Sequence, residues 1–352
     1  MALMAPNPSS QPPLWVTSGD PRAAVWKMVQ GVYRFSALYA MARLDLAGWL
    51  SDGPRTAAEL ASSCGARQDQ LTRLLRALTA MGFLEAADDT FALTEYGATL
   101  NSRLPDSMRW AVLSAGEPGS WNAMTGVTEA VRTGVAPFPE AYGSMYGYLE
   151  RNPEAGHDFD AFMASRSKDA AAALARQYDF SGIRTVTDVG GGVGLVLATL
   201  MTAHPALQGT VFDLKEVAQR AEQFLAVRNL TDRCQFVAGD YFDSVPEGSD
   251  LYLLASIVHN HGREDAIRVL RQVRAAMRPD SRLLALDVLL PQDGRPHFGF
   301  DLDIRMMAVF NGGQERDQVE YAALLSEADL RVTRVEALPP TPLSMIEATP
   351  TF

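Results

Sequence analysis

The residues with the clearest chemical potential form a glycine-rich loop that directly follows an aspartate, Asp188–Gly194 (DVGGGVG). Glycines let the backbone turn tightly and approach a ligand closely beneath a helix N-terminus. The loop departs from the G-x-G-x-x-G pattern that cradles a dinucleotide phosphate, because the sixth position from Gly190 is Leu195. It also lacks the Lys-Ser/Thr pair of a phosphate loop. A carboxylate beside the glycines repels phosphate and suits an ammonium group, so the loop predicts a ligand without phosphates.

Two further acids follow the next two predicted strands. Asp213 stands about 20 residues beyond the glycines, where an acid accepts hydrogen bonds from ribose hydroxyls. Asp240 suits an adenine amino group, with Tyr241 and Phe242 beside the ring. Ligands of open parallel sheets bind at the carboxyl ends of the strands, so the three acids together predict one adenosine site. S-adenosylmethionine fits this pattern, although each acid taken singly is equally compatible with a helix cap.

The elements that must position these acids alternate from Thr185 onward. Alternating strands and helices indicate a largely parallel sheet covered by helices, an α/β fold of the Rossmann-like kind. Strands are predicted at 185–189, 209–212, 235–237, 251–254, 282–286, 331–335 and 344–348. Helices are predicted at 193–203, 216–228, 264–277 and 317–328.

The chain before residue 180 is predicted to be mainly helical. Residues 23–50 are apolar on more than one face, which is typical of a helix buried against another subunit or domain. Residues 55–103 show a helix–turn–helix followed by a hairpin, the pattern of a winged helix. We predict a tail at 1–21, a winged-helix dimerisation domain at 22–105, a helical linker or substrate lid at 106–180 and a catalytic domain at 181–352.

Charge argues against nucleic acid as a partner. The 352 residues carry 31 basic and 42 acidic side chains, a net charge of −11. Within 55–103 five arginines face six acids, whereas a DNA-reading module normally presents a basic face. No apolar run is long enough to span a membrane. The two cysteines, Cys64 and Cys234, exclude a disulfide framework and favour a cytoplasmic location.

In its motifs the chain resembles the small-molecule O-methyltransferases of the caffeate and bacterial natural-product type, over about residues 22–350. The ordered set of matching segments is specific, while each segment singly is not. These segments are Asp188–Gly194, Gly239–Phe242, Val258-His259 before Glu264-Asp265, Leu302–Met307 and Gly312–Arg316.

The resemblance implies a homodimer whose N-terminal helices help to close the partner's pocket, and it implies roles for particular residues. It places His259 as general base, with Asp287 and Glu315 as the acids that flank it. The cofactor positions, from the acids and from the resemblance together, are Asp188, Gly190, Gly192, Asp213, Leu214, Asp240, Tyr241, Phe242 and Ser256. Acceptor-pocket positions are Phe162, Met163, Asn260, Arg305, Met306 and Asn311.

The implied base agrees with elementary chemistry. A phenol with a pKa near 10 is mostly neutral at pH 7, and a histidine can accept its proton. Neighbouring carboxylates would hold the imidazole tautomer and stabilise the imidazolium. The sequence departs from the resemblance after the base, where Asn260-His261 replaces the usual Asp-Trp. His261 is either a second base or a surface residue, and we favour the surface. We expect no metal, because His-x-His alone is a weak signal.

Two other functions stay open. Some relatives bind the cofactor but hydroxylate, decarboxylate or rearrange their substrate, and Asn260-His261 keeps this alternative alive. The other is a regulator that binds DNA through the winged helix, which the acidic balance opposes. The preferred hypothesis is transfer of a methyl group from S-adenosylmethionine to a hydroxyl of an aromatic or polyketide-type natural product.

Overall fold

The structure, a computed structural model, describes residues 20–351, which form two compact units that meet in sequence between Glu117 and Pro118. The tail predicted at 1–21 lies almost wholly outside the described residues. The predicted boundary at 105/106 stays a prediction, and by its contacts the chain divides twelve residues later.

The first unit contains the predicted winged helix. A capping box, in which Thr56 and Glu59 bond each other's backbone N–H, starts α3. Asp45 has a left-handed φ of 49° and separates α1 from α2, where one continuous helical stretch was predicted. Three short strands pair in the order β1-β3-β2. The elements are α1 (Pro21–Arg43), α2 (Leu46–Leu50), β1 (Arg55–Thr56), α3 (Ala57–Cys64), α4 (Gln68–Ala80), β2 (Leu84–Ala87), β3 (Thr90–Leu93), α5 (Glu95–Ala98) and α6 (Arg109–Ala115).

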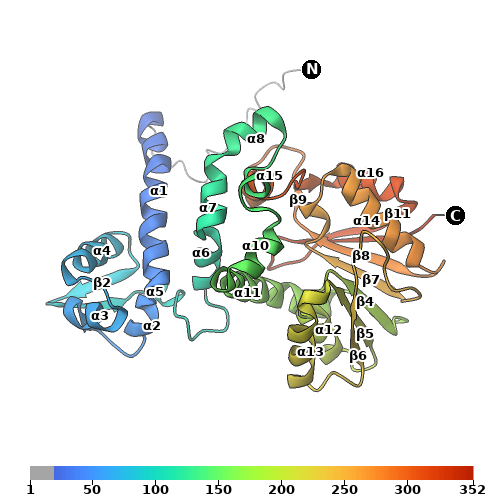
Figure 1. Ribbon diagram of the computed structural model, residues 1–352, viewed down its shortest axis with the longest axis horizontal. Helices are drawn as coiled ribbons and strands as arrows, with labels where there is room; N and C mark the ends of the chain where they lie inside the picture. Colours follow the sequence, from blue (N-terminus) through green and yellow to red (C-terminus); the bar gives the residue numbers. More distant parts are fainter. Residues whose placement is uncertain (1–19, 352) are drawn as a thin grey trace. The chain divides into compact units, whose positions relative to one another are not determined.

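The second unit begins with helices and continues into a sheet with the order β11-β12-β8-β7-β4-β5-β6 (Figure 1). The helices are α7 (Pro118–Thr125), α8 (Val127–Thr133), α9 (Pro137–Tyr142), α10 (Met145–Arg151) and α11 (Pro153–Gln177). The strands are β4 (Thr185–Val189), β5 (Gln208–Asp213), β6 (Cys234–Ala238), β7 (Leu251–Ala255), β8 (Arg282–Asp287), β11 (Leu330–Ala337) and β12 (Ser344–Pro350). The neighbouring strands β8, β7, β4, β5 and β6 run parallel. Strands β12 and β11 join antiparallel at the β8 edge.

Helices cover both faces of this sheet because its strands are apolar on both sides. Along β7, Leu251 and Leu253 pack into one core with α11 and α12, whereas Tyr252 and Leu254 pack into the other with α14 and α16. This alternation follows the two-residue period of a strand. The covering elements are α12 (Leu195–Ala203), η1 (Lys215–Val217), α13 (Ala218–Val227), α14 (Arg263–Ala276) and α16 (Gln318–Glu327).

The fold prediction is confirmed: every predicted strand and helix of this unit is present, with ends shifted by a few residues. Three further elements lie near the site, namely η2 (Val258–Asn260), α15 (Phe298–Val309) and the pair β9 (Leu289–Leu290) with β10 (Arg316–Asp317). In the described part of the chain, no helix has the length and apolarity needed to cross a membrane.

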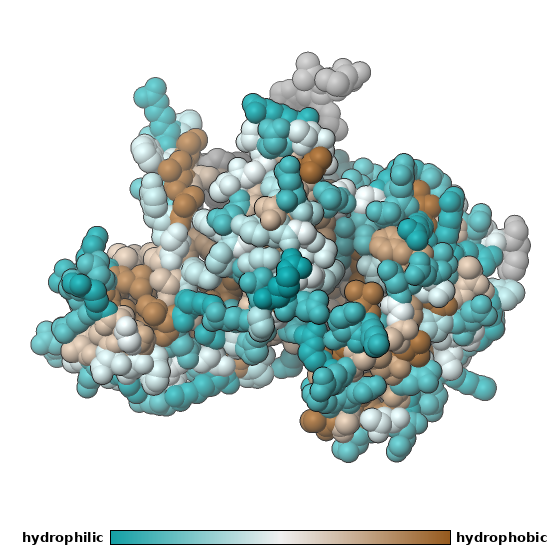
Figure 2. Space-filling view, viewed as in Figure 1, coloured by the Kyte–Doolittle hydropathy of each residue, from teal (hydrophilic) through white to brown (hydrophobic). Residues whose placement is uncertain are grey.

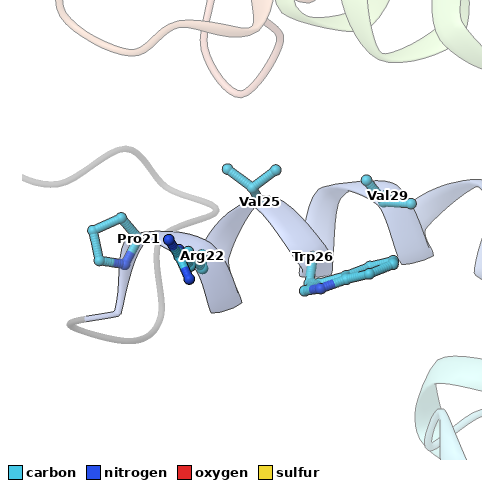
Figure 3. Close-up of a pocket in the computed structure, with 5 residues that line it drawn as sticks. All are labelled: Pro21, Arg22, Val25, Trp26 and Val29. Atoms are coloured by element: carbon cyan, nitrogen blue, oxygen red, sulfur yellow. The ribbon is translucent and has the colours of Figure 1, made fainter.

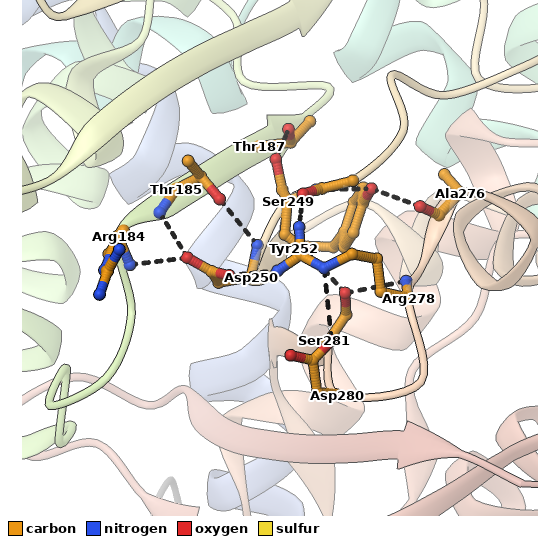
Figure 4. Close-up of polar contacts among 11 residues, drawn as sticks. Arg184, Thr185, Thr187, Ser249, Asp250, Tyr252, Ala276, Arg278, Asp280 and Ser281 are labelled. Carbon is orange, nitrogen blue, oxygen red and sulfur yellow. Dashed lines mark hydrogen bonds and ion pairs between the residues drawn. The ribbon is translucent and has the colours of Figure 1, made fainter.

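A polar network holds the strand ends opposite the glycine loop (Figure 4). Asp250 accepts hydrogen bonds from the backbone of Arg184 and Thr185, at 2.8 and 2.9 Å, and pairs with Arg278. The hydroxyls of Thr187 and Ser249 bond each other at 2.7 Å. This network fixes β4 against β7 and so fixes the level at which Asp188 leaves the sheet.

Candidate active site

The glycine loop connects β4 to α12 and has the conformation that only glycine adopts easily. Gly190, Gly192 and Gly194 have φ values of 69°, 57° and 84°. A Cβ on Gly190 would stand 2.5 Å from Cδ1 of Ile257, and one on Gly194 would stand 2.7 Å from Cγ2 of Val211. Space is open around Gly192, with no atom within 4 Å of a built Cβ. The loop therefore packs tightly on two sides and leaves open space beside Gly192.

Asp188 is buried at the end of β4, with 1 % of its surface exposed. Neither carboxylate oxygen has a hydrogen-bond partner, and the backbone of Leu197 opposes the rise in its pKa less than burial and Asp213 cause it. Burial, followed by the charge of Asp213, raises the pKa of Asp188 to about 7. An enclosed carboxylate without a donor is costly. A ligand ammonium group would supply the missing donors, as predicted for this acid.

The raised pKa of Asp188 predicts that binding of an ammonium ligand depends on pH. The free enzyme holds Asp188 protonated below pH 7, while an ammonium group requires the carboxylate. Affinity for S-adenosylmethionine should therefore be constant above about pH 8 and fall by up to ~10-fold per unit below pH 7. Calorimetric titration between pH 5.5 and 8.5 measures this. The Asp188→Asn variant should bind weakly at every pH, and a flat wild-type profile would contradict the assignment.

Asp213 and Asp240 stand at the next two strand ends as predicted. Asp213 Oδ2 accepts from the Gly192 N–H and Oδ1 accepts from the Leu214 N–H, both at 2.7 Å. Asp213 thus holds the glycine loop, and each oxygen keeps a second lone pair for a ribose hydroxyl. Burial raises the pKa of Asp213, and these two backbone bonds oppose the shift. Asp240 is exposed and accepts from the Phe242 N–H at 2.8 Å.

The surface expectation for His261 is wrong. Its ring is half-buried against Tyr241 and Phe242, edge-on to both, and the Tyr241 hydroxyl lies 3.0 Å from His261 Nε2. Burial lowers the pKa of His261 to about 4, so the imidazole is neutral at physiological pH. The neutral imidazole of His261 and the phenol of Tyr241 form one hydrogen bond, and this bond orients Tyr241. His261 therefore acts as a support for the predicted adenine-side aromatics.

Removing this support should weaken cofactor binding and spare the chemistry. In His261→Phe an aromatic ring is kept and the bond to Tyr241 is lost, so the KM for S-adenosylmethionine should rise roughly 2- to 10-fold with kcat unchanged. Tyr241→Phe should have a similar effect, and the double variant should add little because both remove one interaction. A large fall in kcat for His261→Phe would instead make His261 a second base.

The predicted base lies in η2, just beyond β7, and is 4 % exposed. His259 Nδ1 stands 2.7 Å from Oε1 of Glu315, which is 3 % exposed. Glu315 is itself held by Asp303, whose Oδ1 accepts the Glu315 N–H at 2.8 Å. With Nδ1–H donated to a carboxylate, Nε2 carries the lone pair, and no described residue hydrogen-bonds to it. This tautomer is the one a general base needs.

Asp287 has a different contact from the one implied for it. Its Oδ2 accepts a hydrogen bond from the Tyr321 hydroxyl at 2.8 Å, and its Oδ1 has no partner. Burial raises the pKa of Asp287 to about 6, and the nearby His259 is the main influence that lowers it. Asp287 therefore acts on His259 through its charge, whereas Glu315 acts through a hydrogen bond.

The predicted acceptor positions come from two helices and the loops beside them. Phe162 and Met163 are half-buried on α11; Arg305 and Met306 lie on α15, and Met306 is part of the core. The two amides have other contacts: Asn260 donates to the Ser256 carbonyl at 3.2 Å, and Asn311 accepts from the Ala136 N–H at 3.0 Å. Both amides therefore shape the loops around the site.

The backbone of Ser256, a predicted cofactor position, and the side chain of Arg166 show features that the sequence did not indicate. Ser256 has a left-handed φ of 57°, which is strained for a non-glycine residue, and it lies at the end of β7 beside the glycine loop. Arg166, on α11, was not predicted. The terminal Nη2 of its guanidinium is enclosed and has no partner. Its position one turn after Met163 on the same helix was a usable signal.

A buried acid without a hydrogen-bond donor and an acid with spare lone pairs stand at adjacent strand ends, and these residues fit the ammonium and ribose groups of S-adenosylmethionine, the cofactor of a class of methyltransferases. Comparison with known proteins identifies the family of methyltransferases to which the chain belongs. Residues 124–331 match the O-methyltransferase domain and residues 26–103 match the O-methyltransferase dimerisation domain, so the chain belongs to this family. It is an S-adenosylmethionine-dependent O-methyltransferase.

Relatives of this chain act on bacterial natural products. A mitomycin biosynthesis 6-O-methyltransferase from Streptomyces lavendulae is 37% identical, over 91% of this chain and 92% of its own. The crystal structure of LaPhzM superposes with a TM-score of 0.89 at 34% identity and covers 94% of this chain and 99% of its own.

Two further relatives bear on ligand and reaction. The NcsB1 O-methyltransferase of neocarzinostatin biosynthesis, 31% identical with a TM-score of 0.80 over 90% of this chain and 95% of its own, was crystallised with S-adenosylmethionine and 2-hydroxy-5-methyl naphthoic acid. The aclacinomycin 10-hydroxylase RdmB from Streptomyces purpurascens is 35% identical over 84% of this chain and 80% of its own.

Proposed function

We propose that this enzyme methylates a phenolic or enolic hydroxyl of an aromatic natural product, with His259 as the general base. The observation that carries the proposal is the buried His259–Glu315 hydrogen bond of 2.7 Å, which leaves Nε2 available for a proton. The mitomycin and naphthoate relatives support an aromatic acceptor.

The residues of the site divide the work. When bound, S-adenosylmethionine supplies an electrophilic methyl group. Asp188 and Asp213 hold its ammonium and ribose ends, which fixes the direction from which the acceptor must approach. Nε2 of His259 takes the hydroxyl proton, and Glu315 stabilises the resulting imidazolium through Nδ1–H. Asp303 keeps Glu315 in place through its backbone bond.

Product analysis tests the proposal. The enzyme is incubated with S-adenosylmethionine and a panel of phenols, hydroxynaphthoates and hydroxyquinones, and the products are examined by mass spectrometry. The proposal requires gain of one methyl group with an equal amount of S-adenosylhomocysteine. Gain of an oxygen atom, with the cofactor unconsumed, would support the second candidate, a hydroxylase like the RdmB relative, which Asn260-His261 in place of Asp-Trp keeps open.

We also propose that the enzyme is a homodimer that pairs through α1. One face of this helix exposes large apolar side chains at helical spacing, among them Val25, Trp26, Val29, Val32 and Tyr33. Figure 2 shows hydrophobic surface along α1, and Figure 3 shows Val25, Trp26 and Val29 beside a shallow hollow near its start. The dimerisation domain match begins at residue 26, within this helix.

A charge in this face should separate the subunits. Val29→Asp would place a carboxylate among apolar side chains, so light scattering should report a monomer where the wild type is a dimer. Val227→Asp, at an apolar residue exposed at the end of α13, is the matched control and should stay dimeric. A monomeric wild type, or a Val29→Asp dimer of unchanged affinity, would contradict the assignment.

A further inference from the structure

The hydroxyl of Tyr321 is buried beside one of the two acids predicted to flank the base. Tyr321 lies on α16, is 2 % exposed and donates a hydrogen bond of 2.8 Å to Oδ2 of Asp287. Asp287 ends β8 and is buried as well, and its Oδ1 has no partner. Among the described residues, the Tyr321 hydroxyl is thus the one group that hydrogen-bonds to this carboxyl group.

A short stretch of chain holds both Tyr321 and the hydrogen-bond partner of the base. Glu315, which bonds to His259 at 2.7 Å, begins this stretch, and the strand β10 that follows pairs with β9, just after Asp287. Asp317 then caps α16, because its side chain accepts two backbone N–H groups of the first turn, both at 2.8 Å. Tyr321 follows one helical turn later. The hydroxyl is therefore placed by the same rigid segment that places the acid bonded to the base.

The charges around Asp287 show what this hydrogen bond does. Besides Tyr321, the ionisable groups near Asp287 are His259 of η2, Arg166 of α11, Glu315, and Arg316 of β10. Burial outweighs the groups that favour the carboxylate and raises the pKa of Asp287 to about 6. Burial, followed by the charge of Asp287, raises the pKa of Tyr321 well above its ordinary value, so the phenol stays protonated and remains a donor. Its hydrogen bond stabilises the charged form of Asp287.

We propose that Tyr321 is a positioning residue that keeps Asp287 ionised, so that Asp287 can stabilise the imidazolium of His259 during methyl transfer. The inference rests on the proposed function, in which His259 takes the proton of the acceptor. A buried carboxylate that loses its hydrogen-bond donor is more easily protonated, and a protonated Asp287 has no charge with which to stabilise the imidazolium. Tyr321 acts on the rate through Asp287.

The pH profile of Tyr321→Phe tests the proposal. Single-turnover methylation of a simple phenol is measured from pH 5.5 to 9 at saturating S-adenosylmethionine. Since His259 and Asp287 titrate as a coupled pair, the loss of the donor should move the acidic limb of the profile up by about one pH unit. The rate should fall roughly 5-fold at pH 6 and by less than ~2-fold at pH 9. An unshifted profile would overturn the proposal.

Two further variants separate this role from a structural one. Asp287→Asn is neutral at every pH, so its rate should be low at pH 6 and at pH 9, and adding Tyr321→Phe should lower it no further. Tyr252→Phe is the matched control, because Tyr252 is buried and its hydroxyl bonds the carbonyls of Pro246 and Ala276. It should lose thermal stability and keep the wild-type pH profile. A further loss of rate in the double variant would contradict action through Asp287.

Thermal unfolding tests the same hydrogen bond without the chemistry. The Tyr321 hydroxyl stabilises the carboxylate more than the protonated acid, so the fall in Tm caused by Tyr321→Phe should be larger at pH 8 than at pH 5. The fall caused by Tyr252→Phe should be equal at the two pH values. An equal fall for Tyr321→Phe would overturn the proposal. A wild type that transfers no methyl group would refute the proposed function, and the Tm comparison would still decide whether Tyr321 keeps Asp287 ionised.

Discussion

Replacing His259 by asparagine should lower kcat for methylation of a simple phenol by about 100- to 10,000-fold, the usual contribution of a general base. The variant keeps a polar group near Glu315 but loses the Nε2 lone pair that receives the proton. His259 bonds to Glu315, which is not one of the acids of the predicted cofactor site. S-adenosylmethionine should therefore bind to the variant with unchanged affinity. Single-turnover rates and calorimetry measure the two quantities separately.

His204 supplies the control for this variant. Its Nε2 lies 3.0 Å from the Ala175 carbonyl and its ring packs on Phe180, away from the site described above. His204→Asn should lower thermal stability and leave the rate constant near that of the wild type. Full activity of His259→Asn, in a folded sample that binds the cofactor, would remove His259 from the mechanism.

Asp213→Ala should weaken S-adenosylmethionine binding by roughly 100-fold or more. The carboxylate is predicted to accept bonds from the ribose hydroxyls, and hydrogen bonds to a charged group contribute about 1.5–3 kcal/mol each. The substitution also releases the Gly192 and Leu214 N–H groups, so the glycine loop loses its anchor. Calorimetric titration at pH 8, where Asp188 is mostly ionised, measures the loss.

Two companion variants separate charge from fold in this experiment. Asp213→Asn keeps an acceptor for one backbone N–H and should bind with intermediate affinity. Glu222→Ala removes an exposed acid from α13 and should bind as the wild type does. Wild-type affinity in Asp213→Ala would show that the ribose is held elsewhere.

The elements of the catalytic unit were predictable because their patterns are local. Apolar strand runs, helical spacing and glycine breaks are properties of neighbouring residues, and they placed Asp188, Asp213 and Asp240 at the strand ends where the structure has them. The partnership of His259 and Glu315 joins residues 56 positions apart, and only the family resemblance indicated it.

The remaining contacts depend on tertiary packing, to which sequence patterns are insensitive. The Tyr321 hydroxyl reaches Asp287 because α16 packs against the sheet beside β8, which no spacing reveals. The surface interpretation of His261 failed because two aromatic rings and a tyrosine hydroxyl from the loop after β6 enclose it. Arg166 was overlooked because an arginine on a helix is usually exposed, and only the structure shows that its end is enclosed.

The most direct test of His259 as the base uses phenols of decreasing pKa. An ordinary phenol, with a pKa near 10, needs a base to lose its proton, while an acidic nitrophenol is already ionised at pH 8. Single-turnover methylation by wild type and His259→Asn is compared across the series. We predict that the deficit of the variant is largest for the least acidic phenol and almost disappears for the nitrophenol. A deficit of the same size for every phenol would contradict proton removal by His259.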